Sequence, residues 1–346
     1  MNKIKIKDLL KGYSIGKSAI QNIANMTVVP IISEVEYTPI ADISNIRIKR
    51  DIMYNEIEFE NISDNIGILL QGYTIFSYQK AQDRTIPYAH LIKSKMSKRI
   101  PANCVQRSQC GLLNEKKLKQ EDFRILPTTL RAKALMHSTY TDASTSALWD
   151  DLNQFSPETN VDEKGLFSFY IKFKNQLNEF IASFEPVDKQ LGSIVLINDR
   201  IAAFDIVPNY KNWLLVYRPL IRDSYAAEAI RAIQNKKIKS LISVIDDKEV
   251  TTILSLENAY KKNTQDFYKR ISDIIEMNIE LEVSYKTLDT VADLNLVKIK
   301  SQQYIGCAVF HGQHIIYLSL VSKSLQDKAI EDFEKIDKYS DKEFEI

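Results

Sequence analysis

The sequence predicts an α+β protein in which a β-rich N-terminal half, an antiparallel meander, packs with a C-terminal half of β-hairpins and amphipathic helices. Apolar and polar residues alternate with a period of two through 46–60, as in half-buried strands. Between 144 and 184 the apolar residues recur instead at helical spacings of three and four. Two similar segments, 192–207 and 306–321, each have the pattern of a β-hairpin.

The composition is that of a globular protein with a sizeable core. Of the 346 residues, 45% are hydrophobic and 26% are charged. The 46 basic and 45 acidic residues leave a formal net charge of +1. This charge gives no overall electrostatic reason to bind nucleic acid or an anionic membrane, so we expect neither as a partner.

The cysteines and the N-terminus indicate a cytoplasmic protein. Cys104, Cys110 and Cys307 are odd in number and widely spaced, which argues against a disulfide framework and favours a reducing compartment. The basic start is not followed by the apolar segment of a signal peptide. No stretch approaches the ~18 uninterrupted apolar residues that a membrane-spanning helix needs.

The N-terminal half divides into an arm, residues 1–24, and a β-rich lobe at about 25–113. Pro30 lies within an apolar strand and places it at a sheet edge or bulge, because proline cannot donate to the ladder. The predicted strands are 26–32, a pair within 46–60, two short strands around Gly72 within 66–78, and strand material within 86–100.

The C-terminal half is a lobe of helices and hairpins at about 114–325, followed by a charged tail, 326–346, and the two lobes together form one domain, 25–325. Ser144 is a suitable N-cap for the first of these helices, and Pro219 should end or kink another. The predicted helices are 144–155, one long helix at 165–184, two helices within 209–236, and 255–278.

The two hairpin segments align without a gap, with Gly192 opposite Gly306. Each has an apolar strand, a two-residue turn and a second apolar strand, and the turns are Asn198-Asp199 and Gly312-Gln313. We interpret them as equivalent hairpins of two related half-domains, or as one recurrent supersecondary unit.

Three weaker motifs favour structural interpretations. Residues 12–18 (GYSIGKS) resemble a phosphate-binding loop, but they have three residues between the glycines where four are required, so we interpret them as a turn. His311 and His314 lie in a hairpin turn without an evident third metal ligand. Cys104 near Arg107 suits a lowered-pKa thiolate, but without an activating histidine we favour a buried strand residue. We expect no metal and no cofactor.

Two polar clusters are candidate binding sites. Gln82-Asp83-Arg84 combines amide, carboxylate and guanidinium groups that can read a nucleotide, although a solvated loop has the same composition. Arg218 and Arg222 precede Ser224 and Tyr225 at a helix junction, which suits a phosphate site. A capped helix with Tyr225 in the core explains the second cluster equally well.

In chain order these segments resemble one known family. They are the strand ending at Pro30, a hairpin at Leu69–Gly72, Gln82-Asp83-Arg84, Ile100–Gln106, the Leu148-Trp149 helix, the 192–207 hairpin, Leu220–Ala226, and the 306–321 hairpin. The pattern resembles the ARPP domain over about residues 22–322, a family named for its association with ADP-ribosylglycohydrolases and rhodanese-type phosphatases. Tyr73 and Gln106 stand where the family pattern has glutamates, so two acidic positions are lost.

The resemblance implies a component of a prokaryotic antiviral conflict system that binds or processes ADP-ribose or another NAD-derived nucleotide. If it is an enzyme, a hydrolase-like action is implied, but the lost acidic residues leave catalysis open. The residues expected to hold phosphates are Arg84, Arg218 and Arg222. Gln82, Asp83 and Gln106 are expected to contact ribose or base, and Tyr225 to pack on the site wall. The candidate ligand contacts are Gln82, Asp83, Arg84, Cys104, Gln106, Arg218, Arg222, Ser224 and Tyr225.

The alternative is a non-catalytic structural or interaction subunit of a defence complex. The lost acidic residues favour it, and so do apolar edge strands that can pair with a protein partner or with a second copy.

Overall fold

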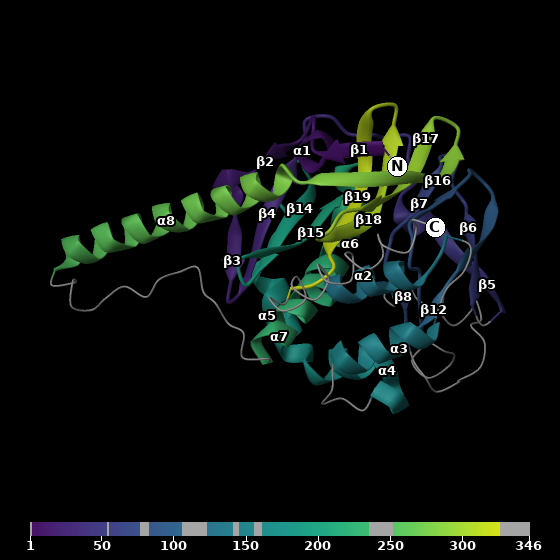
Figure 1. Cartoon of the computed structure of the whole chain (residues 1–346), viewed down its shortest axis with the longest axis horizontal. Helices are drawn as coiled ribbons and strands as arrows, with labels where there is room; N and C mark the ends of the chain where they lie inside the picture. The colour runs from purple at the N-terminus through teal and green to yellow at the C-terminus, as the bar shows by residue number, and fades with distance from the viewer. Residues whose placement is uncertain are drawn as a thin grey trace, which may run out of the picture.

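The body of the molecule is one large antiparallel sheet with helices on both faces. Figure 1 shows the computed structural model of the chain, which describes residues 2–53, 55–76, 83–105, 123–140, 145–155, 161–234 and 252–325. Among these residues ten strands form the sheet, in the order β1-β16-β17-β18-β19-β15-β14-β4-β2, with β3 paired to β4. Their bounds are β1 Asn2–Lys5, β2 Ser14–Ile15, β3 Gln21–Ile23, β4 Met26–Ile32, β14 Gln190–Ile197, β15 Arg200–Ile206, β16 Glu282–Val291, β17 Leu294–Lys300, β18 Tyr304–His311 and β19 His314–Ser322.

The two predicted hairpins are confirmed, and they lie side by side at the centre of this sheet. β14 pairs with β15, β18 pairs with β19, and β15 pairs with β19. The aligned residues Asp205 and Ser319 are direct partners across β15 and β19. Both hairpins also have a register shift at the equivalent place, after Val195 and after Val309. A local two-fold axis between Asp205 and Ser319 therefore relates the hairpins.

Glycines allow each hairpin to close. A Cβ atom on Gly192 would lie 2.1 Å from the carbonyl oxygen of Asp205, and one on Gly306 would lie 1.9 Å from that of Ser319. Because these obstacles are backbone atoms, a side chain has no room at either position.

The remaining strands of the N-terminal half form three small antiparallel sheets, and the predicted α+β class is confirmed. The strand order is not that of a sequential meander, since β7 pairs with β10 and β8 with β9 and β13. The sheets are β10 (His90–Ile92) with β7 (Gly67–Leu69); β11 (Ser97–Pro101), β6 (Glu56–Asn61) and β5 (Ile46–Met53); and β12 (Asn103–Cys104), β9 (Arg84–Thr85), β8 (Tyr73–Ile75) and β13 (Phe123–Ile125).

Alternate residues of the central strands enter two separate cores. Val195 and Ala203 pack in a core with Trp213 of α6, whereas Ile194 and Phe204 pack with Ile271 of α8 on the opposite face. Helices α2, α6 and α7 therefore cover one face, and α1 and α8 cover the other. The helices are α1 Ile6–Leu9, η1 Lys17–Ala19, η2 Ile43–Asn45, α2 Thr128–His137, α3 Thr145–Phe155, α4 Val161–Lys172, α5 Lys174–Ser183, α6 Tyr210–Pro219, the π-helix η5 Leu220–Ala226, α7 Ala227–Gln234 and α8 Ile253–Ile279.

Several predicted boundaries change. The single helix expected over 165–184 is wrong: α4 and α5 are separated at Phe173, whose backbone (φ −103°, ψ 20°) leaves the helical region while its ring stays in the core. Apolar spacing continues across this break, so periodicity could not reveal it. The hairpin expected around Gly72 is also wrong. Gly72 does make a turn with φ +76°, but β7 and β8 on either side pair with other strands.

The two prolines lie where they were predicted to interrupt regular structure. Pro30 lies on β4 between the residues that pair with β3 and those that pair with β2, where its missing N–H costs no ladder bond. Pro219 ends α6, and the chain continues as the wider π-helix η5. The segment predicted as an N-terminal arm contributes β1, β2, β3 and α1 to the body. The 326–346 tail and the Ser144 cap lie outside the described residues.

In the part of the chain that the structure describes, no helix has both the length and the apolar character needed to span a membrane.

Candidate functional site

The first predicted cluster lies in the small sheet that contains β9 and β12. Arg84 and Cys104 are direct partners across these strands, and the Val105 N–H donates to the carbonyl oxygen of Asp83 at 2.9 Å. Arg84 is fully buried, and its Nη1 donates to the carbonyl oxygen of Glu56 at 3.3 Å. The structure thus brings Asp83, Arg84 and Cys104 together; Gln82 and Gln106 lie outside the described residues.

The second predicted cluster lies on α6 and η5. Arg218 is exposed on α6. The Nε of Arg222 donates to Asp223 at 2.6 Å, and Arg124 of β13 approaches the same carboxylate at 3.5 Å. Burial raises the pKa of Asp223 well above its usual range, against the opposing effect of Arg124. Ser224 is fully buried.

The two clusters point to opposite faces of the small sheet. Arg84 pairs with Ile75 of β8, whereas Arg124 pairs with Thr74, the next residue. Because successive side chains of a strand point to opposite faces, the guanidinium of Arg84 points toward β6 and that of Arg124 toward η5. Arg84 and Arg222 therefore do not share one cavity.

Tyr225 belongs to a third group of polar residues, which is sealed between the central hairpins and α2. Arg131 donates through both terminal nitrogens to Asp205, at 2.8 and 3.0 Å, and through Nη1 to Ser319 at 3.0 Å. The hydroxyl of Tyr225 donates to Asp205 at 2.6 Å. Burial, and secondarily the charge of Asp205, raises the pKa of Tyr225 well above its usual range.

This group, hereafter the axis cluster (Arg131, Asp205, Ser319 and Tyr225), lies where the two-fold axis passes between the hairpins. Arg131 is 1% exposed. Gly72 covers its aliphatic stem so closely that a Cβ atom there would lie 2.6 Å from Arg131 Cγ. Solvent and ligands cannot reach this pair, so it has no part in binding. Its two hydrogen bonds connect α2 to β15.

An open polar cavity of about 220 Å³ lies on the same face of the main sheet, between α2, α3, α7 and the end of β19. We call it the α2–α7 cavity. Its lining is rich in charged and hydrogen-bonding side chains and consists of Thr129, Leu130, Lys133, Asp151, Gln154, Phe155, Arg231, Lys323, Ser324 and Leu325.

The N-terminus of α2 builds one wall of the cavity. The first N–H groups of a helix lack partners within the helix, and the residue before α2, Pro127, makes no side-chain cap. Glu228 of α7 supplies the cap instead: its Oε2 accepts from the N–H of Thr129 at 3.1 Å and from the hydroxyl of Thr129 at 2.6 Å. Its other oxygen, Oε1, accepts from Arg231 Nη1 at 3.0 Å. Glu228 is 2% exposed, so this pair is fixed in place.

A second carboxylate, Asp151 of α3, stands at the opposite wall. Lys133 lies 3.3 Å from its Oδ1, and Nε2 of His137 lies 2.7 Å from its Oδ2. Thr129, Lys133 and His137 are four residues apart along α2, which places them on one helical face toward α3. A carboxylate held in this way can accept from a ligand hydroxyl, and a histidine that it orients can exchange protons.

Arg231 is the cation best placed to meet a ligand. It is 18% exposed, and its guanidinium lies 5.0 Å from the centre of the Phe155 ring. Its Nε is buried and has no hydrogen-bond partner among the described residues. Lys133 and Lys323 bring further positive charge to the lining. Cationic donors beside an aromatic ring suit an anionic group, above all phosphate.

Sequence reasoning did not find this cavity. Its residues come from four segments that are far apart in the chain: α2, α3, α7 and the residues that follow β19. The one available signal was the spacing of Thr129, Lys133 and His137 on one face of a helix. No group of three or more His, Cys, Asp or Glu residues is placed to hold a metal ion in the described ranges.

Comparison with known proteins gives one result. A family model, described as the ARG and Rhodanese-Phosphatase-superfamily-associated Protein domain (ARPP-1), matches residues 13–321. No curated protein and no solved structure matches the chain.

Proposed function

Because the chain belongs to the ARPP-1 family, we propose that it binds ADP-ribose or another NAD-derived nucleotide as a component of a prokaryotic antiviral conflict system. The family description associates the domain with ARG, the ADP-ribosylglycohydrolases of the sequence resemblance, and with a rhodanese-phosphatase superfamily. The observation that carries the proposal is the α2–α7 cavity, which is lined by the partly exposed Arg231 beside Phe155 and by Lys133 and Lys323.

Each lining group has a proposed role. Arg231, with Lys133 and Lys323, contacts the phosphates. Asp151 accepts from a ribose hydroxyl. The cavity of about 220 Å³ is smaller than the ~300–1,000 Å³ of a pocket that encloses a whole drug-sized ligand. It therefore holds the ribose-phosphate part, and the rest of the nucleotide lies outside.

Arg218 and Arg222, the phosphate contacts proposed from the sequence, remain the alternative location on the same protein. Arg222 and Arg124 flank one buried carboxylate, Asp223, and burial raises the pKa of that carboxyl group. The guanidinium groups of Arg222 and Arg124 would bind a phosphate if their contacts with Asp223 broke. Substitutions separate the two locations, since Arg231 and Arg222 share no partner among the contacts described.

The direct test is a thermal-shift titration with ADP-ribose, AMP and ribose 5-phosphate, and with adenosine as the control without phosphate. A ligand that binds only the folded state adds about 2.7 kcal/mol of stability at a hundred times its Kd. We expect the three phosphate compounds to raise the Tm by several degrees and adenosine to leave it unchanged. No rise with any of them at millimolar concentration would contradict the proposal.

A second candidate function is that of an interaction subunit without small-molecule chemistry. Exposed apolar side chains at the start of α8, Ile253 and Leu254, favour it. Absence of any nucleotide-induced shift, together with stable self-association, would support this function instead.

A further inference from the structure

Helix α8 is much longer than the part of it that packs on the sheet. Its 27 residues extend over about 40 Å at 1.5 Å per residue. Phe267, Ile271 and Ile275 are buried against the sheet, whereas the N-terminal half runs out beyond the edge of the body, as Figure 1 shows. We call residues 253–266 the α8 arm.

The α8 arm exposes apolar side chains. Ile253 is 87% exposed and Leu254 is 66% exposed. A helix of about 14 residues is only marginally stable in water without packing. Exposed large apolar residues at the end of a projecting helix are typical of a surface that another protein covers.

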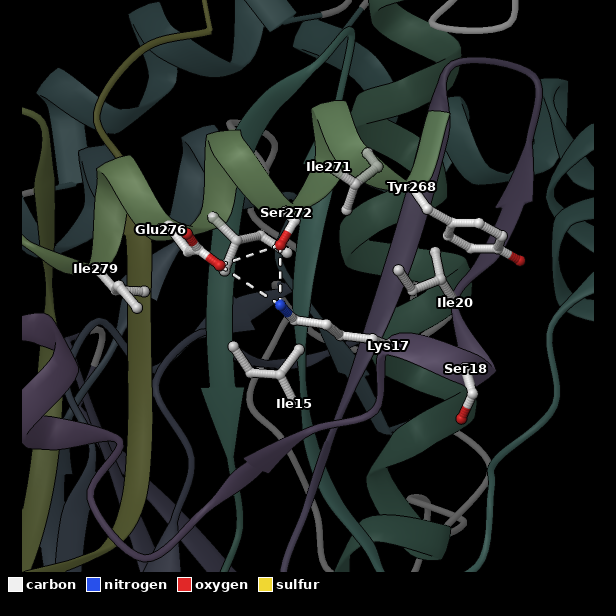
Figure 2. A pocket seen from close by; sticks show the side chains of 10 residues that line it. Ile15, Lys17, Ser18, Ile20, Tyr268, Ile271, Ser272, Glu276 and Ile279 are labelled. Atoms are coloured by element: carbon white, nitrogen blue, oxygen red, sulfur yellow. Dashed lines mark hydrogen bonds and ion pairs between the residues drawn. The ribbon is translucent and has the colours of Figure 1, made fainter. Parts of the chain in front are cut away.

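The packed half of α8 borders an apolar groove of about 560 Å³. Figure 2 shows it between α8 and the segment that contains β2 and η1. Its walls are largely isoleucine, and at its centre Lys17 Nζ donates to Ser272 at 2.9 Å and lies 3.4 Å from Glu276. The α8 residues that line it are Tyr268, Ile271, Ser272, Ile275, Glu276 and Ile279.

Groove and arm match in length and in charge. The groove follows α8 from 268 to 279, about 18 Å, and the arm of 253–266 is about 21 Å long. Both halves of α8 carry exposed charges of both signs: Lys262 and Asp266 on the arm, and Lys269, Arg270 and Asp273 along the groove. An antiparallel arrangement of two such helices about residue 267 brings Lys262 of each within a turn of Asp273 of the other, and Asp266 of each within a turn of Lys269 of the other.

We propose that a second copy of this chain occupies the groove. The two α8 helices pair in antiparallel order about a two-fold axis near residue 267, and the arm of each copy lies in the groove of the other. In this register Leu254 of one copy lies near Ile279 of the other, and Lys262 lies near Ser272. One patch then serves both subunits, as closed two-fold symmetry requires. The proposal does not depend on nucleotide binding.

Light scattering after size-exclusion chromatography tests the proposal first. We expect the purified chain to have twice the monomer mass of 39.8 kDa. Leu254→Asp should shift it to the monomer and raise the dissociation constant at least tenfold. Val35→Asp, at another apolar residue that is 78% exposed, is the matched control and should leave the dimer intact. A monomeric wild-type chain, or a dimer that Leu254→Asp does not weaken, would overturn the proposal.

A disulfide test checks the register. Leu254 and Ile279 are 25 residues apart on one rigid helix, about 38 Å, so cysteines at both positions cannot join within one copy. Under mild oxidation we expect the Leu254→Cys/Ile279→Cys variant to form a covalent dimer. Each single variant, which keeps the native cysteines, should form none. Absence of the covalent dimer in the double variant would overturn the antiparallel register.

Discussion

Two arginine–carboxylate pairs lie on the same face of the main sheet, and they differ in their exposure to solvent and therefore in their roles. Arg131 and Asp205 are sealed at the two-fold axis, where Arg131 is 1% exposed and also donates to Ser319. Arg231 and Glu228 make a single contact at 3.0 Å, and Arg231 is 18% exposed at the wall of the α2–α7 cavity. The first pair can act only on the protein, whereas the second can also meet a ligand.

The access of solvent and ligands to the arginine, more than its charge, separates a structural ion pair from a binding group. In the axis cluster both carboxylate oxygens are taken by Arg131 and Tyr225. Both arginines have a buried Nε without a hydrogen-bond partner among the described residues, so it is their exposure, 1% for Arg131 and 18% for Arg231, that separates them. Removing each arginine should therefore change different properties of the protein.

The largest effect is expected from Arg131→Met. It leaves Asp205 buried without its cation, which typically costs about 3–5 kcal/mol of unfolding free energy. Urea unfolding followed by circular dichroism measures this loss. The double variant Arg131→Met/Asp205→Asn should recover part of it, because the buried charge is gone. A loss below about 1 kcal/mol in the single variant would contradict a structural role for the pair.

The glycines that bring the hairpins together give the next largest effect. In Gly306→Ala the new Cβ meets the carbonyl oxygen of Ser319 at 1.9 Å, so the strands must separate, at a cost of about 1–3 kcal/mol. Gly312→Asn is the control, since that position has open space and φ +59°, which asparagine tolerates. Equal stability of the two variants in thermal unfolding would show that the close approach of the strands does not contribute to the free energy of unfolding.

His90 extends the comparison to a buried base whose ring nitrogens have no hydrogen-bond partner among the described residues. Burial, and secondarily the charge of Lys98, lowers its pKa to about 3. Below about pH 6.5 His90 therefore binds a proton in the unfolded state but not in the folded state. The free energy of unfolding decreases as the pH falls from 6.5 toward 3. Between pH 6.5 and pH 5 this loss is about 1.6 kcal/mol.

A His90→Phe variant isolates this contribution. The ring stacks on Tyr140 with centroids 4.8 Å apart, so phenylalanine keeps the packing. Urea unfolding of both proteins at pH 5 and pH 6.5 should show a smaller acid loss in the variant. Parallel losses would mean that His90 takes up its proton in the folded state as well.

The smallest effect on stability is expected from Arg231→Met. Glu228 is buried and loses its cation, but it keeps its bonds to Thr129 at the N-terminus of α2, which also favours its negative charge, so the loss should be about 1 kcal/mol. Thermal unfolding without ligand measures it. A loss as large as that of Arg131→Met would remove the contrast between the two pairs.

Local patterns predicted much of the fold. The hairpins were predicted from turn residues between apolar strands. The position of Pro30 was predicted from the N–H donor that proline lacks. The break at Phe173 could not be predicted, because apolar spacing continues through it. The cavity could not be predicted either: Arg231 and Glu228 come from α7, Asp151 from α3 and Thr129 from α2, and only tertiary packing brings them together. Arg84 illustrates the converse, since its position in a polar segment concealed that it is fully buried.

The central claim, that the α2–α7 cavity binds a phosphate-bearing nucleotide, is tested most directly by isothermal titration calorimetry with ADP-ribose. The wild-type chain, Arg231→Met and Arg222→Met should be compared. We predict that Arg231→Met weakens binding at least tenfold, about 1.4 kcal/mol, and that Arg222→Met binds as the wild type does. Unchanged binding by Arg231→Met, with loss of binding in Arg222→Met, would contradict the claim and place the nucleotide at η5.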